Sequence, residues 1–227
     1  MSSGIEDEPA LNGVAPDGGL DFDPLYGEGA LAGTEAAEAD RARHAAHLRA
    51  MWSEPPSARR AAFVLGVCAV SGLLAVVCAL LKGTIGVFAL SVTVGAPVIE
   101  EMAKVALALW TLEKSPWKFQ SFSEIMLAGV ASAAVFAAIE NVLYLCVYIP
   151  KDDLSSGIVL YRLIVCTAVH IVCTSVASAG LARGWREAKA RLGEFRKSRA
   201  MPFLVAAMVL HGLHNAGAIV WSIANNG

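Results

Sequence analysis

The chain has 227 residues, of which 56% are hydrophobic and only 17% are charged, and its mean hydropathy is +0.56. This composition is too apolar for a soluble domain of this length, and the apolar residues come in blocks long enough to cross a bilayer. The sequence therefore predicts an integral membrane protein. The basic residues lie at the borders of the apolar blocks rather than in one patch, which argues against nucleic-acid binding.

The N-terminal segment differs sharply from the rest of the chain. Half of the 20 acidic residues precede residue 41, and no Lys or Arg does. Residues 1–33 are rich in Gly, Pro, Asp and Glu and have no periodic apolar face, so we expect them to be disordered. A short helix is expected near 35–52. We therefore divide the chain into an acidic, mostly disordered cytoplasmic tail (1–57) and a transmembrane domain (58–227).

Five apolar segments predict an all-α, polytopic transmembrane helical bundle with about five spans, at 61–81, 84–112, 122–149, 158–181 and 202–223. The second segment is long and is broken at Gly95 and Pro97, because proline lacks a backbone N–H and kinks helices. Five spans place the basic loops on one side of the membrane, which the positive-inside rule makes cytoplasmic. The N-terminus is then cytoplasmic and the C-terminus lies on the opposite side; in a bacterium this membrane is the cell membrane.

The most unusual stretch, Ala-Pro-Val-Ile-Glu-Glu-Met-Ala-Lys at 96–104, carries three ionisable residues inside an apolar run. Each ionised group at bilayer depth costs at least about 2.5 kcal/mol, so these side chains require partners or a chemical role. Glu140, His170 and His211 lie at a comparable depth on three other predicted spans; Glu100, His170 and His211 are about 14–18 Å from the nearer span end. Four helices therefore deliver ionisable groups to one level, which predicts a functional site.

Hydrolysis is the chemistry that such a cluster favours. A carboxylate in apolar surroundings next to a second carboxylate can serve as a general base on water, and histidine or asparagine donors can stabilise an oxyanion. The chain has no GxSxG, HExxH, P-loop or dinucleotide motif, so water is the expected nucleophile. Cys166 and Cys173 flank His170 at helical spacing, and a thiolate nucleophile remains a minor alternative. An odd number of cysteines in apolar runs favours neither disulfides nor a zinc finger.

Four motifs on successive predicted spans resemble the PrsW family of intramembrane proteases, which belongs to a superfamily with CAAX prenyl-endoproteases and bacteriocin-processing enzymes. They are Glu100-Glu101-x-x-Lys104, Phe136-x-x-x-Glu140-Asn141, the single His170, and His211-x-x-x-Asn215. The resemblance covers about residues 60–223.

The resemblance implies a membrane peptidase in which the first glutamate motif, together with a residue of the second, activates water. The implied catalytic residues are Glu100, Glu101, Glu140, His170, His211 and Asn215. His211 and Asn215 would bind the oxyanion, and His170 would be a further catalytic or orienting group. Lys104, Phe136 and Asn141 would support them. The sequence leaves open which of the two adjacent glutamates faces the cavity.

The implied substrate is a membrane-anchored protein, such as a membrane-tethered regulator. CAAX-type relatives have histidine where this chain has Glu140, so a prenylated substrate is less favoured. The expected partners are this substrate and the lipid bilayer, and the oligomeric state stays open.

Three alternatives remain. We expect no cofactor, but in a zinc-dependent version Glu100, Glu140, His170 and His211 would hold the ion. A non-catalytic membrane scaffold or immunity-type protein could keep the same fold. A proton-coupled transporter is the third alternative, disfavoured because the sequence shows one broken segment and no internal repeat.

Overall fold

The computed structural model describes residues 35–53, 55, 57–81 and 90–226, and the secondary structure in these ranges is helical throughout. This confirms the all-α prediction. The expected disorder of residues 1–33 lies outside the described residues. The short N-terminal helix is α2 (Glu35–Trp52). The chain divides into two compact units, residues 1–46 and 47–227, and the second unit holds the apolar helices.

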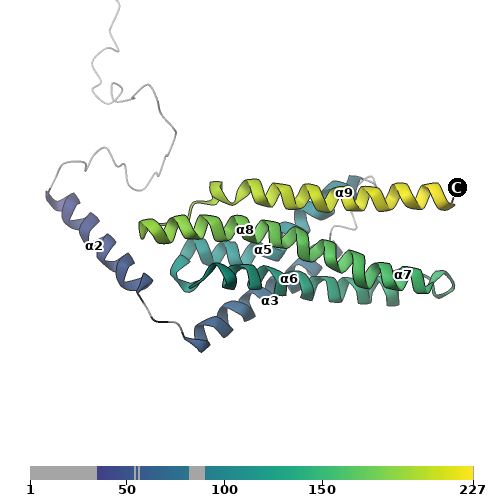
Figure 1. Ribbon diagram of the computed structural model, residues 1–227, viewed down its shortest axis with the longest axis horizontal. Coiled ribbons are helices and arrows are strands. Elements are labelled where there is room, and N and C mark those ends of the chain that lie inside the picture. Colours follow the sequence, from purple (N-terminus) through teal and green to yellow (C-terminus); the bar gives the residue numbers. More distant parts are fainter. Residues whose placement is uncertain (1–34, 54, 56, 82–89, 227) are drawn as a thin grey trace, which may run out of the picture. The chain divides into compact units, whose positions relative to one another are not determined.

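The helices of the second unit follow the predicted segments closely (Figure 1). They are α3 (Ala58–Leu81), the π-helix η3 (Ser91–Gly95), α5 (Ala96–Lys114), α6 (Phe122–Leu143) with the π-helix η5 (Tyr144–Tyr148), α7 (Ser156–Leu160), the π-helix η7 (Tyr161–Cys166), α8 (Thr167–Arg191) and α9 (Met201–Asn226). Short 3₁₀ turns lie at η4 (Pro116–Lys118), η6 (Lys151–Asp153) and η8 (Lys197–Arg199).

By length and composition, four described helical runs can cross a membrane: 58–80, 122–148, 156–191 and 201–224. The remaining predicted span corresponds to η3 and α5, which carry the charged motif. The third of these runs, 156–191, extends ten residues beyond the predicted end at 181, because α8 continues as a helix into the basic segment.

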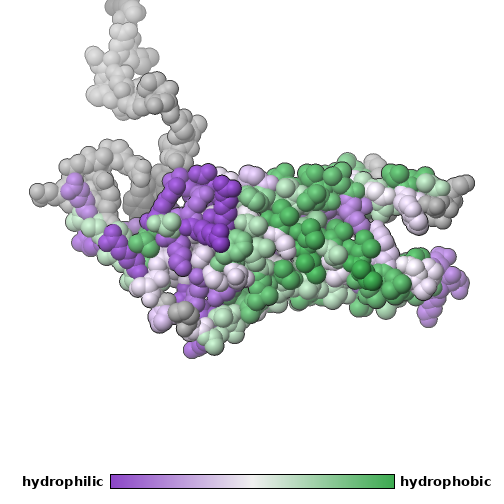
Figure 2. All heavy atoms as spheres, viewed as in Figure 1, coloured by the Kyte–Doolittle hydropathy of each residue, from purple (hydrophilic) through white to green (hydrophobic). Residues whose placement is uncertain are grey.

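Helix α5 occupies the interior of the second unit, where it contacts α3, α6, α8 and α9. Its buried residues include Glu100, Glu101 and Lys104. Apolar side chains cover the middle of the bundle, and hydrophilic side chains gather at the end where α8 terminates (Figure 2). The charged motif of α5 is therefore enclosed by other helices rather than exposed to lipid, as expected for ionisable residues in a membrane.

Small residues allow the helices around α5 to approach closely. A Cβ added at Gly72 of α3 would collide with the Ser132 carbonyl oxygen of α6, and one added at Gly129 of α6 would collide with Ser178 Oγ of α8. Such small-residue contacts are typical of membrane helix interfaces, where backbone packing replaces the hydrophobic effect.

The predicted break at Pro97 is a widened helical turn rather than an interruption. The Ala96 N–H donates to Ser91 O, five residues back. Pro97 has no N–H to offer. The carbonyl of Val92 therefore receives no backbone hydrogen bond from Ala96, which donates to Ser91, or from Pro97, which has no N–H. It instead accepts a hydrogen bond from Asn215 Nδ2 of α9 at 3.0 Å. The turn before α5 and the last motif of the chain are thus directly connected.

Candidate active site

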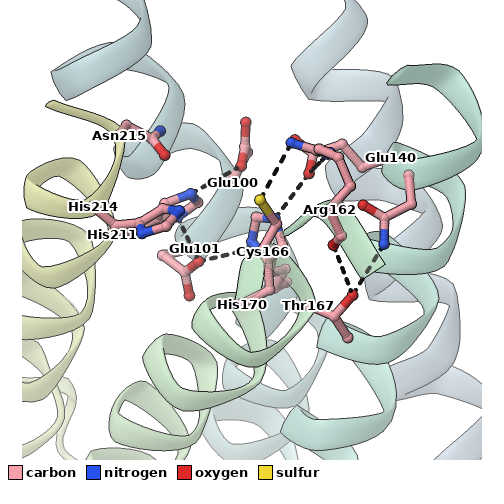
Figure 3. Close-up of polar contacts among 12 residues, drawn as sticks. Glu100, Glu101, Glu140, Arg162, Cys166, Thr167, His170, His211, His214 and Asn215 are labelled. Atoms are coloured by element: carbon pink, nitrogen blue, oxygen red, sulfur yellow. Dashed lines mark hydrogen bonds and ion pairs between the residues drawn. The ribbon is translucent and has the colours of Figure 1, made fainter. Parts of the chain in front are cut away.

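The structure brings predicted site residues from four helices to the wall of one cavity of about 750 Å³ (Figure 3). Those that line it are Glu100 of α5, Phe136 and Glu140 of α6, His170 of α8, and His211 and Asn215 of α9. Three predicted residues, Glu101, Lys104 and Asn141, lie behind the wall. Lys104 is buried against the site, and Asn141 donates through Nδ2 to Thr167 Oγ1 at 3.0 Å.

The two adjacent glutamates point in different directions. Successive residues of an α-helix are rotated by about 100°. Glu100 lines the cavity, whereas Glu101 is fully buried. Glu101 Oε1 lies 2.7 Å from Lys104 Nζ and 3.0 Å from His211 Nδ1, and Oε2 accepts from Thr174 Oγ1 at 2.9 Å. In this structure, Glu100 is the cavity-facing carboxylate and Glu101 organises the side chains behind it.

These contacts determine the tautomer of His211. A carboxylate can only accept hydrogen bonds, so the contact with Glu101 requires the proton of His211 to be on Nδ1. In the neutral form of the ring, the lone pair is then on Nε2, which lies 3.8 Å from Glu100 Oε2. A water molecule can hydrogen-bond to both atoms across a separation of this size.

The tautomer of His170 is determined in the same way. The Lys104 ammonium has only donors and lies 3.0 Å from His170 Nδ1, so Nδ1 accepts. The proton is therefore on Nε2, which donates to Glu140 Oε2 at 2.9 Å. The His170 and Phe136 rings also form a T-shaped contact with centroids 4.9 Å apart, and Lys104 Nζ lies 4.2 Å from the Phe136 centroid.

Arg162 is a site residue that the sequence interpretation missed. Arg162 lies four residues after the start of the span predicted at 158–181, a position from which a long side chain can reach the membrane interface. In the structure, Arg162 Nη2 instead donates to Glu140 Oε2 at 2.8 Å. Its guanidinium carbon lies 3.8 Å from the Tyr144 ring centroid. The signal was present, because Arg162, Cys166 and His170 are spaced at intervals of four and share a helix face.

The cysteine alternative gains no support from these contacts. All five cysteines are free thiols. Cys166 lines the cavity, but its sulfur lies 3.6 Å from Arg162 Nη1, and a guanidinium cannot serve as a base.

The donor set fits a divalent metal ion only in part. Ligand atoms of Glu100, His170 and His211 lie within 4.8 Å of one another. Glu100 and His211 suit the role, because a metal-binding histidine typically donates its other N–H to a carboxylate, as His211 does to Glu101. His170 has partners on both ring nitrogens, so it can bind a metal only by giving up Lys104 or Glu140. Glu140, the expected fourth ligand, lies outside this group.

The bundle of apolar helices is that of a polytopic membrane protein. The carboxylate and imidazole groups around its cavity are of the kinds that hydrolases use. The model of the PrsW family, described as intramembrane metalloproteases, matches residues 54–226. The chain belongs to this family, and is therefore placed among membrane peptidases. No curated protein and no solved structure gives a significant match.

Proposed function

We propose that this protein is an intramembrane endopeptidase in which Glu100 activates a water molecule to cleave a membrane-anchored protein. The observation that carries the proposal is the pairing of Glu100 Oε2 with His211 Nε2 across 3.8 Å at the cavity wall, with Glu101 behind His211. Two acceptors are thus aimed at one position, and a water molecule has two hydrogens to donate.

The reaction follows from this arrangement. Glu100 takes a proton from the water as the water oxygen bonds to the scissile carbonyl carbon, and the carbonyl oxygen becomes an oxyanion. When the tetrahedral intermediate collapses, the C–N bond breaks and the proton on Glu100 passes to the departing amine. The products are a new C-terminal carboxylate and a new amine, and Glu100 is again ionised.

The roles of the last motif change in detail. The sequence interpretation assigned oxyanion binding to both His211 and Asn215. Because His211 is protonated on Nδ1, its Nε2 accepts from the water, so the neutral ring orients the nucleophile. Asn215 Nδ2 uses one hydrogen for Val92 O and keeps a second, which we assign to the oxyanion.

A bound divalent ion would act as a Lewis acid and lower the pKa of its water, and Glu100 and His211 are the residues best placed to hold it. An ion held there would take the Glu100 and His211 lone pairs that are assigned above to the water, so the metal-bound and metal-free versions are alternatives. The proposed orientation, with a cytoplasmic N-terminus and the C-terminus opposite, rests on the distribution of basic loops. The proposed substrate class rests on the burial of the site among membrane-spanning helices.

Cleavage of single-span peptides by the protein in proteoliposomes tests the proposal. Glu100→Gln should lower kcat by about 10²–10⁴, the usual contribution of a general base. Glu113→Gln is the matched control, because Glu113 also lies on α5 but pairs with Lys197 away from the cavity. Full biological function in a Glu100→Gln strain would support the non-catalytic scaffold instead.

A further inference from the structure

We propose that Arg162 is a positioning residue of the hydrolytic site and that it acts through Glu140 on His170. The inference rests on the proposed function. It starts from one atom, because Glu140 Oε2 receives both the Arg162 Nη2 donor at 2.8 Å and the His170 Nε2 donor at 2.9 Å. A carboxylate oxygen held by two donors has a defined position, and so does the hydrogen bond it offers to the imidazole.

Arg162 is itself held in place from two sides. Its guanidinium stacks over Tyr144, and Nη1 lies 3.6 Å from Cys166 Sγ. Arg162 belongs to the π-helix η7 and Tyr144 to the π-helix η5. Such widened turns occur often at functional sites. The Arg162 and Glu140 side chains are 13% and 18% exposed, so the pair borders the cavity and is largely shielded from solvent.

The charges on this side of the site alternate. From Arg162 the contacts run through the Glu140 carboxylate and the neutral His170 ring to the Lys104 ammonium and the Glu101 carboxylate. His170 is the group in the series whose donor atom depends on its neighbours, because arginine and lysine only donate and carboxylates only accept. Glu101 in turn fixes the tautomer of His211. Arg162 therefore stands at one end of a series of contacts that reaches the residue orienting the water.

Loss of Arg162 would leave Glu140 Oε2 with one donor instead of two. The carboxylate could then rotate away from His170 Nε2, and the ring would lose the acceptor that keeps Nδ1 facing Lys104. The expected consequence is a mixture of His170 orientations or tautomers, of which only one places the proton as in this structure. We expect kcat to suffer more than KM, since the effect reaches the nucleophile rather than the apolar walls.

The test compares Arg162→Gln, Arg162→Lys and Arg186→Gln in proteoliposomes. Arg186 is the matched control, because its guanidinium also stacks on an aromatic ring, Phe122, at 4.3 Å but lies on the far part of α8. Arg162→Gln should lower kcat about 10–100-fold, as is usual for groups that orient a histidine, with KM changed less than about threefold. Arg162→Lys should recover part of kcat. Arg186→Gln should leave both constants unchanged.

Arg162→Gln is also measured in a Glu140→Gln background. If Arg162 acts through Glu140, the second substitution should lower kcat by less than about twofold in that background, the signature of a coupled pair. Equal losses of kcat in the two backgrounds would overturn the proposal, and so would a normal kcat in Arg162→Gln. If Arg162→Gln does not fold, a normal kcat in Arg162→Met, or an Arg162→Lys variant no better than Arg162→Met, would overturn it.

A readout independent of cleavage separates this inference from the proposed function. In ¹⁵N-histidine NMR spectra of the protein in nanodiscs, His170 should show a proton on Nε2, and its signals should change in Arg162→Gln but not in Arg186→Gln. Unchanged His170 signals would refute the role of Arg162 even if the protein is a peptidase. A changed spectrum in a protein that cleaves nothing would instead refute the proposed function.

Discussion

Replacing each of the adjacent glutamates by glutamine should produce two different defects. Glu101 Oε1 lies 2.7 Å from Lys104 Nζ, and both side chains are fully buried. At an effective dielectric constant of 20, this separation corresponds to about 6 kcal/mol of attraction. Removing one partner of a buried pair typically costs about 3–5 kcal/mol, so Glu101→Gln should destabilise the protein by that amount. The corresponding fall in the melting temperature is about 6–20 °C.

Glu100→Gln is the matched substitution at the next residue. Glu100 lines the cavity, where solvent can replace part of the interactions that its carboxylate loses, and its Oε2 lies 3.8 Å from His211 Nε2. Its melting temperature should therefore stay near that of the wild type, while its cleavage rate falls by about 10²–10⁴. Glu101→Gln should lose activity as well, because His211 loses the acceptor that orients it.

Thermal unfolding of purified protein in detergent, read by the loss of monodisperse protein, measures the first effect. Peptide cleavage in proteoliposomes below the melting temperature of each variant measures the second. The reasoning is refuted if the two variants melt at the same temperature, or if Glu100→Gln is destabilised and Glu101→Gln is not. Retention of wild-type cleavage by Glu100→Gln would refute the assignment of the general base.

Three further predictions concern the contacts around the site. Gly212→Ala should lower both stability and kcat, because the added Cβ would collide with a backbone carbonyl of η3. Gly217→Ala should change neither, because the space around Gly217 is open. Thermal unfolding and cleavage assays compare the two variants. Asn215→Ala should cost about 0.5–1.5 kcal/mol by removing the hydrogen bond to the part-buried carbonyl of Val92. Adding Pro97→Ala should restore part of that stability by supplying an N–H, and no gain in the double variant would contradict the explanation of the widened turn. Because both ring nitrogens of His170 have partners, we expect cleavage to survive dialysis against a chelator. A loss of activity that zinc reverses would contradict the metal-free mechanism and favour an ion at Glu100 and His211.

The helices could be predicted because apolar length is a local property of the sequence. The third apolar segment, expected at 122–149, appears as α6 and η5 over 122–148. The location of the irregular turn before α5 also followed from one residue, Pro97, which lacks a donor. What the pattern could not show was which group would replace that donor, because Asn215 lies more than a hundred residues away and meets Val92 only after α9 packs against η3.

The site was predictable as a set of residues but not as a network. Depth along each span was enough to expect Glu140, His170 and His211 near α5. Arg162 lies only four residues into its predicted span, and this position suggested an interfacial side chain that reaches water. In the structure Arg162 instead points inward to Glu140, since the free-energy cost of burying one charge is smaller when an opposite charge is already buried beside it.

The adjacent carboxylates show why packing has to be known before chemistry can be assigned. Helical geometry alone separates Glu100 and Glu101 by about 100° and gives no preference for either. The preference comes from the neighbours, because Lys104, Thr174 and His211 all meet Glu101. A carboxylate saturated in this way is a poor base, since its oxygens already hold three donors. Glu100 lines the cavity, so a water molecule in the cavity can reach its carboxylate, and the buried glutamate determines where the imidazole beside it points.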